Sequence, residues 1–128
     1  FGPRTERNYE KKINAKVMKK AMRMSLSAKA EEGKLFLLDS WTLPKAKTKA
    51  VVQVLRALHI PLEKKHAAFL VTHEKAHDLI QHARNIPSLA TAGKENVSII
   101  DLLKYPYMVA TPESVDYLTK VYGNKKAV

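Results

Sequence analysis

The sequence predicts an α/β fold: a three-layer sandwich with a mostly parallel sheet of about four strands, preceded by a basic extended segment and a basic amphipathic helix. Three observations favour this fold class. Short apolar runs alternate with amphipathic stretches, which is the order of a parallel sheet whose strands are connected by helices. The runs are apolar throughout, as expected of strands covered on both faces. Basic residues are concentrated before the first of these runs.

The chain has 128 residues, the usual size of one domain. Residues 1–11 contain an early Gly-Pro and charged side chains without hydrophobic periodicity, so we expect them to form a basic extended segment. We expect residues 12–128 to form a single α/β domain. No internal repeat or low-complexity segment divides it.

Residues 12–32 have the periodicity of a helix, and Gly33 supplies the signal that ends it. Apolar side chains recur every three or four residues, which predicts a face that packs on the core. A second stripe of basic side chains lies roughly 115° around the same helix, at about 100° per residue. The apolar stripe consists of Ile13, Val17, Ala21, Met24 and Ala28, and the basic stripe consists of Lys12, Lys16, Lys19, Lys20 and Arg23.

Strands and helices alternate in the rest of the chain. The helix that follows the first strand should bury Val51, Val54, Leu55 and Leu58, and the closing helix begins at Pro112, because proline is favoured in the first helical turn. The predicted strands are residues 35–38, 67–72, 89–92 and 107–111, and the predicted helices are residues 47–58, 74–85, 98–104 and 112–122.

Positive charge is the unusual feature of the composition. The chain has 23 Lys and Arg against 12 Asp and Glu, a net charge of +11 with a pI near 9.9. Residues 1–34 carry a net +6 and the other 94 residues carry +5. Such an excess predicts a polyanionic partner, and its distribution describes a globular body with a denser basic arm.

Composition also argues against several classes of protein. No segment reaches the ~18 consecutive apolar residues of a membrane span, and the N-terminus lacks the apolar segment of a secretory signal. We therefore expect a soluble, intracellular protein without a membrane partner. The absence of cysteine excludes disulfides and thiolate metal ligands in this sequence.

Motifs for nucleotide binding are missing. Neither G-x-G-x-x-G nor a P-loop occurs, and the chain has only four glycines. We interpret the polar residues that follow the predicted strands as loop residues and helix caps, and expect no catalytic residue, no cofactor and no small-molecule substrate. These polar residues are Asp39, Ser40, Thr72, His73 and Thr111.

One motif points to another chemistry. His73, Glu74 and His77 match the H-E-x-x-H pattern, in which two histidines on one helical face hold zinc and the glutamate polarises its water. Against a zinc site, Lys75 places a positive charge beside the metal, the motif directly follows a predicted strand, and no clear third ligand follows. The favoured interpretation is a solvent-exposed first helical turn, and a zinc-dependent hydrolase is the less favoured alternative.

Basic residues interleaved with an aromatic residue indicate nucleic-acid binding. Arg4, Arg7 and Tyr9 precede the basic stripe, and lysines cluster again before the second predicted helix. Lys and Arg neutralise phosphates and release counterions, and tyrosine stacks on unpaired bases. The lysines of the second cluster are Lys45, Lys47 and Lys49.

The order of several segments resembles the large-subunit ribosomal protein L-four family, of the bacterial and organellar type. The likeness covers nearly all 128 residues, and its specificity comes from order and spacing together. It implies an α/β sandwich and a basic loop that runs through ribosomal RNA to the wall of the nascent-peptide tunnel. The segments are FGPR, LSAKAEEGKLFLLD, PKAKTKAVVQVLRAL, HARNIP and NVSIIDLLKYPYMVAT.

The resemblance implies a structural, non-enzymatic component of the large ribosomal subunit, in a bacterial cytoplasm or an organelle matrix, with ribosomal RNA and neighbouring ribosomal proteins as partners. FGPR would be where the tunnel loop returns to the body, the family's first strand and most of that loop being absent from this sequence. A non-ribosomal RNA-binding adaptor is a further alternative. The expected RNA-binding residues are Arg4, Arg7, Tyr9, Lys11, Lys12, Lys16, Lys19, Lys20, Arg23, Lys45, Lys47 and Lys49, together with Arg84, which rests mostly on the resemblance.

Overall fold

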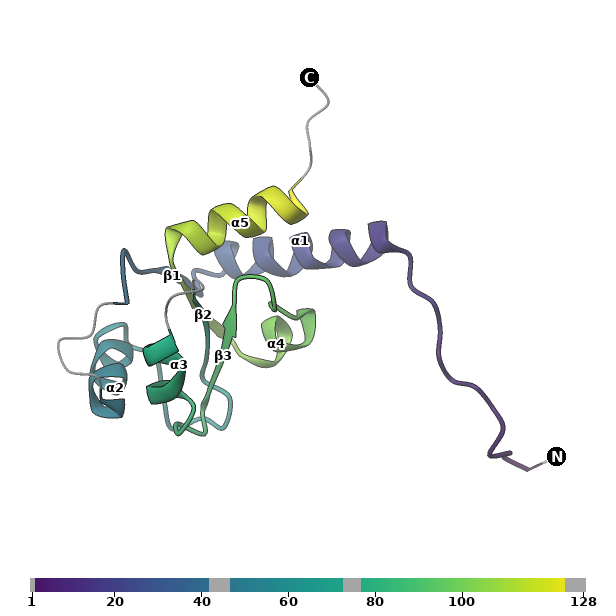
Figure 1. Ribbon diagram of the computed structural model, residues 1–128, viewed down its shortest axis with the longest axis horizontal. Helices are drawn as coiled ribbons and strands as arrows, with labels where there is room; N and C mark the ends of the chain where they lie inside the picture. The colour runs from purple at the N-terminus through teal and green to yellow at the C-terminus, as the bar shows by residue number, and fades with distance from the viewer. Residues whose placement is uncertain (1, 42–46, 73–76, 124–128) are drawn as a thin grey trace, which may run out of the picture.

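Four strands form one parallel sheet in the order β1-β4-β2-β3 in the computed structural model, which describes residues 2–41, 47–72 and 77–123 (Figure 1). The central strands β4 and β2 pair with Tyr107 opposite Ala68, and each has an edge strand on its other side. The prediction of a parallel sheet is confirmed. The strands are β1 (Leu35–Leu37), β2 (Ala68–Thr72), β3 (Leu89–Gly93) and β4 (Tyr107–Ala110).

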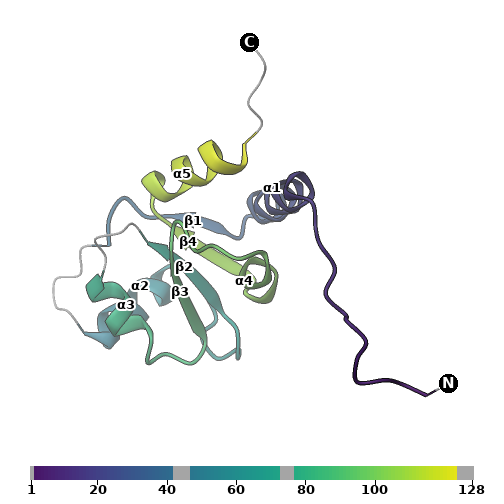
Figure 2. The ribbon, with the colours of Figure 1, turned by 45° about the vertical axis from the view of Figure 1, so that its right-hand side comes forward.

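Helices cover both faces of the sheet, which gives the three predicted layers (Figure 2). One face carries α1 (Ala15–Glu31), α4 (Ile99–Lys104) and α5 (Pro112–Tyr122). The other face carries α2 (Thr48–Ala57) and α3 (His77–Ala83). Residues 74–76, which the sequence also assigned to the third helix, lie outside the described residues.

Alternation along β2 builds the two halves of the core, because successive side chains of a strand point to opposite faces. Ala68 and Leu70 pack with α2 and α3, whereas Phe69 and Val71 pack with α1, α4 and α5. Burial on both faces is therefore confirmed for β2, in which every residue is buried. It is wrong for β1, where Leu37 is exposed because the strand lies at the edge of the sheet.

Local signals end or begin the helices, and those predicted at Gly33 and Pro112 are confirmed. Gly33 follows α1 with a φ of +65°, a left-handed conformation that glycine adopts without a Cβ clash. Ser98 caps α4, and its Oγ accepts a hydrogen bond of 3.2 Å from the main-chain N–H of Ile100. Pro112 occupies the first turn of α5.

The predicted packing face of α1 is wrong. Val17 and Met24 are exposed, whereas Met22 is buried against α4 and α5 together with part of Leu26. The true packing stripe, formed by Met22, Leu26 and Lys29, lies roughly 145° around the helix from the predicted one. Both stripes repeat at steps of three and four residues, so periodicity alone did not separate them.

Lys29 explains why the sequence did not indicate the true packing stripe. Its side chain is only 8% exposed, and its Nζ donates hydrogen bonds to the carbonyl oxygens of Tyr105 and Pro106. A lysine contributes a long apolar stem while its ammonium group finds partners at the end of the stem. The last turn of α1 is thereby joined to the start of β4.

Candidate nucleic-acid interface

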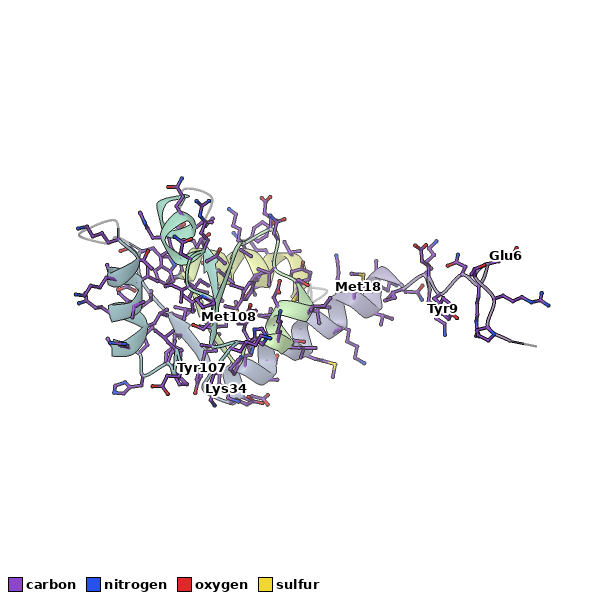
Figure 3. The ribbon with its side chains drawn as sticks, turned by 90° about the horizontal axis from the view of Figure 1, so that it is seen from below. Glu6, Tyr9, Met18, Lys34, Tyr107 and Met108 are labelled. Atoms are coloured by element: carbon purple, nitrogen blue, oxygen red, sulfur yellow. The ribbon has the colours of Figure 1, made fainter. Side chains whose placement is uncertain are left out.

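Residues 2–14 extend away from the α/β body, and each of them is exposed (Figure 3). Glu6 and Tyr9 lie far from the sheet in this view, and Met18 marks the part of α1 that reaches toward them. The segment carries the predicted RNA-binding residues Arg4, Arg7, Tyr9, Lys11 and Lys12.

Arg7 and Tyr9 form a cation–aromatic pair in this segment. The guanidinium carbon of Arg7 lies 5.3 Å from the centroid of the Tyr9 ring, and the tyrosine is 73% exposed. A positive charge against a ring face is weakly attractive at an exposed site. The arrangement offers a charge for a phosphate and a flat ring for a base on one short stretch of chain.

The first half of α1 continues the positive charge. Lys16, Lys19 and Lys20 are exposed, and none of them has a hydrogen bond or ion pair within residues 2–41, 47–72 and 77–123. The first turn holds no acidic residue, and Asn14 makes no capping hydrogen bond with its side chain. Lysines beside the positive end of a helix dipole are slightly destabilising, and an anion bound at this end of α1 would relieve that repulsion.

Arg23 and Lys19 lie closer to the body than the other members of the basic stripe. Arg23 is half-buried and borders a shallow cleft with Leu118 and Thr119 of α5. Lys19 borders an apolar groove of about 530 Å³ between α1 and the segment around Val97. Lys16 and Lys20 are therefore the residues of α1 most open to a large partner.

The remaining predicted RNA-binding residues lie elsewhere. Lys47 precedes α2 and Lys49 is within it, and Arg84 directly follows α3; all three are exposed. Because α2 and α3 cover the opposite face of the sheet from α1, these residues do not share a surface with the N-terminal group (Figure 2). Lys45 lies outside the described residues.

The zinc motif falls mostly on residues that the structure does not describe. His73, Glu74 and Lys75 lie outside the described ranges, and so does the side chain of His77. Within the part of the chain that is described, no group of three His, Cys, Asp or Glu side chains could hold a metal ion. In that same part, no helix has the length and apolar character needed to cross a membrane.

Polar side chains at the carboxyl ends of the strands are bonded within the protein. The Thr72 hydroxyl donates to the carbonyl oxygen of Ala92 at 3.4 Å, and the hydroxyls of Thr111 and Ser114 share a hydrogen bond of 2.8 Å. Thr72 is the last residue of β2, so its interpretation as a loop or cap residue is wrong. Thr111 is the N-cap residue of α5, but its side chain makes no capping hydrogen bond. The two hydrogen bonds stabilise the ends of β2 and β4.

A model of the ribosomal protein L4/L1 family matches residues 1–121. The chain belongs to this family. The match runs through the basic segment, α1 and the whole sheet, and so confirms the resemblance inferred from the order of the sequence segments.

Curated relatives are similar along nearly the whole chain. The large ribosomal subunit protein uL4 of Magnetococcus marinus is 36% identical over 115 residues, which are 90% of this chain and 53% of the relative. The proteins of the same name from Ruminiclostridium cellulolyticum and Lachnoclostridium phytofermentans are 33% and 34% identical over 123 residues, 96% of this chain and 57% of each relative. The chain thus spans little more than half the length of the relatives it matches.

Lys29 is the basic residue of α1 whose role the sequence did not reveal. It stands seven residues after Met22, a spacing of two helical turns, so it lies on the packing stripe and not on the basic one. The available signal was this register, shared with Met22 and Leu26.

Proposed function

We propose that this chain is a structural component of the large ribosomal subunit, which binds ribosomal RNA through residues 2–14 and α1 and stabilises RNA near the nascent-peptide exit tunnel. The observation that carries the proposal is the exposed cationic arm on a well-packed body. The arm holds Arg4, Arg7 and Tyr9 in its extended part and Lys16 and Lys20 on the helix. Family membership and the name of the curated relatives support the ribosomal assignment.

The mechanism is neutralisation and positioning, and no bond is made or broken. Lysine and arginine side chains release counterions from the RNA backbone, which allows negatively charged strands to converge. Specificity comes from RNA shape and backbone contacts, because the deep major groove of A-form RNA is closed to side chains. The α/β body fixes the direction in which α1 presents its lysines.

Sedimentation tests the ribosomal assignment. A native extract is separated on a sucrose gradient, and the fractions are probed for this chain. Co-sedimentation with large subunits, retained after a moderate-salt wash, is expected. Recovery only in the light fractions, together with RNA binding by the pure protein, would instead indicate a non-ribosomal adaptor.

Charge reversal tests the surface. The variant Lys16→Glu/Lys20→Glu should bind a large-subunit ribosomal RNA transcript more weakly, and the slope of log K against log salt should flatten by about 0.7–0.9 per lost contact. Arg56→Glu/Lys120→Glu is the matched control, because both of its residues are exposed and it changes the net charge equally. Equal effects of the two variants would show that the binding is non-specific.

The zinc-dependent hydrolase gains no support from the fold or from the relatives. Metal analysis of the purified protein decides it directly. Stoichiometric zinc that is lost on changing His73 would revive that alternative.

A further inference from the structure

In a parallel sheet all strands begin at the same end, and in this protein lysines lie at that end. Lys34 directly precedes β1, Lys104 stands three residues before β4, and Lys65 stands three residues before β2. These strands are neighbours in the order β1-β4-β2, and adjacent strands lie about 4.8 Å apart. We call Lys34, Lys65, His66 and Lys104 the amino-end patch.

Contacts between the residues that precede β2 and those that precede β4 hold the patch together. The His66 ring lies edge-on to the Tyr105 ring, with 5.2 Å between the centroids, and the Lys104 Nζ lies 5.7 Å from the centroid of the same ring. Lys34 lies beside Tyr107 (Figure 3). Tyr105 is buried, so its ring holds the segments that contain His66 and Lys104 against the body.

The charges of the patch are only partly balanced. Glu32 accepts a hydrogen bond of 2.6 Å from Lys34, whereas Lys65 and Lys104 have no hydrogen bond or ion pair among the described residues. Burial lowers the pKa of His66, and the charges of Lys104 and Lys65 lower it further. Like charges that a fold holds together in this way are relieved by an anionic ligand.

The surface beside the patch is concave. A cleft of about 240 Å³ lies between the last turn of α1 and α4, and its walls include Lys29, Glu32, Lys34, Leu103 and Pro106. Leu103 is strongly exposed, so the cleft offers an apolar wall beside the ion pair of Lys34 and Glu32. The unbalanced positive charge of the patch comes from Lys65 and Lys104. The sugar–phosphate backbone of RNA, with its apolar ribose carbons and its charged phosphates, suits such a surface.

We propose that the amino-end patch is a second RNA-binding site, which holds the sugar–phosphate backbone of large-subunit ribosomal RNA independently of residues 2–14. This inference rests on the proposed function. It places RNA at the amino ends of the strands, whereas ligands of open α/β sheets usually bind at the carboxyl ends. Lys29 joins the last turn of α1 to the amino end of β4, so the patch lies at the opposite end of α1 from residues 2–14.

A binding experiment on the full chain tests the patch. Lys65→Glu/Lys104→Glu should flatten the salt slope for a large-subunit ribosomal RNA transcript by about 1.4–1.8, the effect of two lost phosphate contacts. Arg56→Glu/Lys120→Glu, with the same change in net charge, should leave the slope at the wild-type value. Lys65→Gln/Lys104→Gln provides the milder variant, and a urea unfolding curve of each protein verifies that it folds.

The imidazole of His66 reports on the same surface. In an NMR titration, RNA bound at the patch should raise the pKa of His66, because phosphates offset the charges of Lys65 and Lys104. In a protein saturated with RNA through the arm alone, this pKa would stay at its value in the free protein.

The two proposals fail in different ways. A wild-type chain that does not bind the transcript refutes the proposed function. A chain that binds, is weakened by Lys16→Glu/Lys20→Glu and is unaffected by Lys65→Glu/Lys104→Glu refutes only the patch. A third outcome would assign the patch to a protein partner and overturn the inference. In that case Lys65→Glu/Lys104→Glu would lose association with an acidic ribosomal protein but bind RNA like the wild type, and RNA would leave the pKa of His66 in the wild type unchanged.

Discussion

Lys29 and Tyr105, 76 residues apart in the chain, are joined by a hydrogen bond of 2.7 Å from the lysine Nζ to the main-chain carbonyl oxygen. A second bond of 2.9 Å reaches the carbonyl oxygen of Pro106. These two carbonyls precede β4, whose first residues pair with β2. One lysine therefore secures α1, which forms part of the cationic arm, to the centre of the sheet.

Removing this lysine should destabilise the fold. Lys29→Ala leaves two carbonyl oxygens without their charged donor, and we expect the free energy of unfolding to fall by about 1.5–3 kcal/mol. Lys29→Met keeps the apolar stem and should recover part of the loss. Urea unfolding measures both variants, with the exposed Lys20→Ala as control; equal stability of Lys29→Ala and Lys20→Ala would contradict the role assigned to Lys29.

The same lysine predicts a dependence on pH. Burial lowers the pKa of Lys29 from its usual value of 10.5, so the unfolded chain binds the proton more tightly than the folded one. The contribution of Lys29 to stability should therefore rise as the pH increases through the lowered pKa toward 10.5, and should fall again as the pH returns to neutral. Unfolding curves of the wild type and Lys29→Met over this range isolate the effect, and a constant difference between the two proteins would count against it.

The corrected packing face of α1 gives a prediction with an internal control. Met22 is 4% exposed and Met24 is 63% exposed, although both are methionines of one helix. Met22→Ala should cost about 2–5 kcal/mol through lost packing and the cavity left behind, whereas Met24→Ala should change stability by less than about 0.5 kcal/mol. Equal losses of stability for Met22→Ala and Met24→Ala, measured by thermal or urea unfolding, would contradict the corrected packing face.

Periodicity and strand composition predicted the order of the elements because each carries its own signal. Gly33 and Pro112 marked helix ends through backbone chemistry that holds in any context. The orientation of α1 required knowledge of what it packs against. Lysines normally face water, so the sequence did not indicate that Lys29 lies on the packing face. Its burial is favourable because the carbonyl oxygens of Tyr105 and Pro106 accept hydrogen bonds from its Nζ.

The candidate site was predictable to a similar degree. Charge density located residues 2–14 and the first half of α1, because their lysines and arginines are close in sequence. The amino-end patch draws Lys34, Lys65 and Lys104 from three separate regions. Their common position just before a strand was visible, but the strand order that makes them neighbours was not.

Gly33 and Gly93 isolate the effect of backbone strain, because neither position is crowded. A Cβ at either position meets nothing within 4 Å, but only Gly33 has a left-handed backbone, with a φ of +65°. Gly33→Ala should therefore lower the free energy of unfolding by about 1–2 kcal/mol, and Gly93→Ala should have little effect. Gly33→Asn should fall between wild type and Gly33→Ala, because asparagine tolerates this conformation better. Equal unfolding midpoints for Gly33→Ala and Gly93→Ala would refute the strain argument.

The pair of Arg7 and Tyr9 allows stacking and charge to be measured separately on the proposed RNA-binding arm. Tyr9→Ala removes a ring but no charge, so affinity for large-subunit ribosomal RNA should fall by about 1–3 kcal/mol at every salt concentration, with the salt slope unchanged. Arg7→Ala removes a charge and should flatten the slope by about 0.7–0.9. Tyr9→Phe, which keeps the ring, should bind like the wild type. If Tyr9→Ala instead changed the slope and left the affinity at high salt intact, the tyrosine would act by positioning Arg7, 5.3 Å from its ring, and not by stacking on a base.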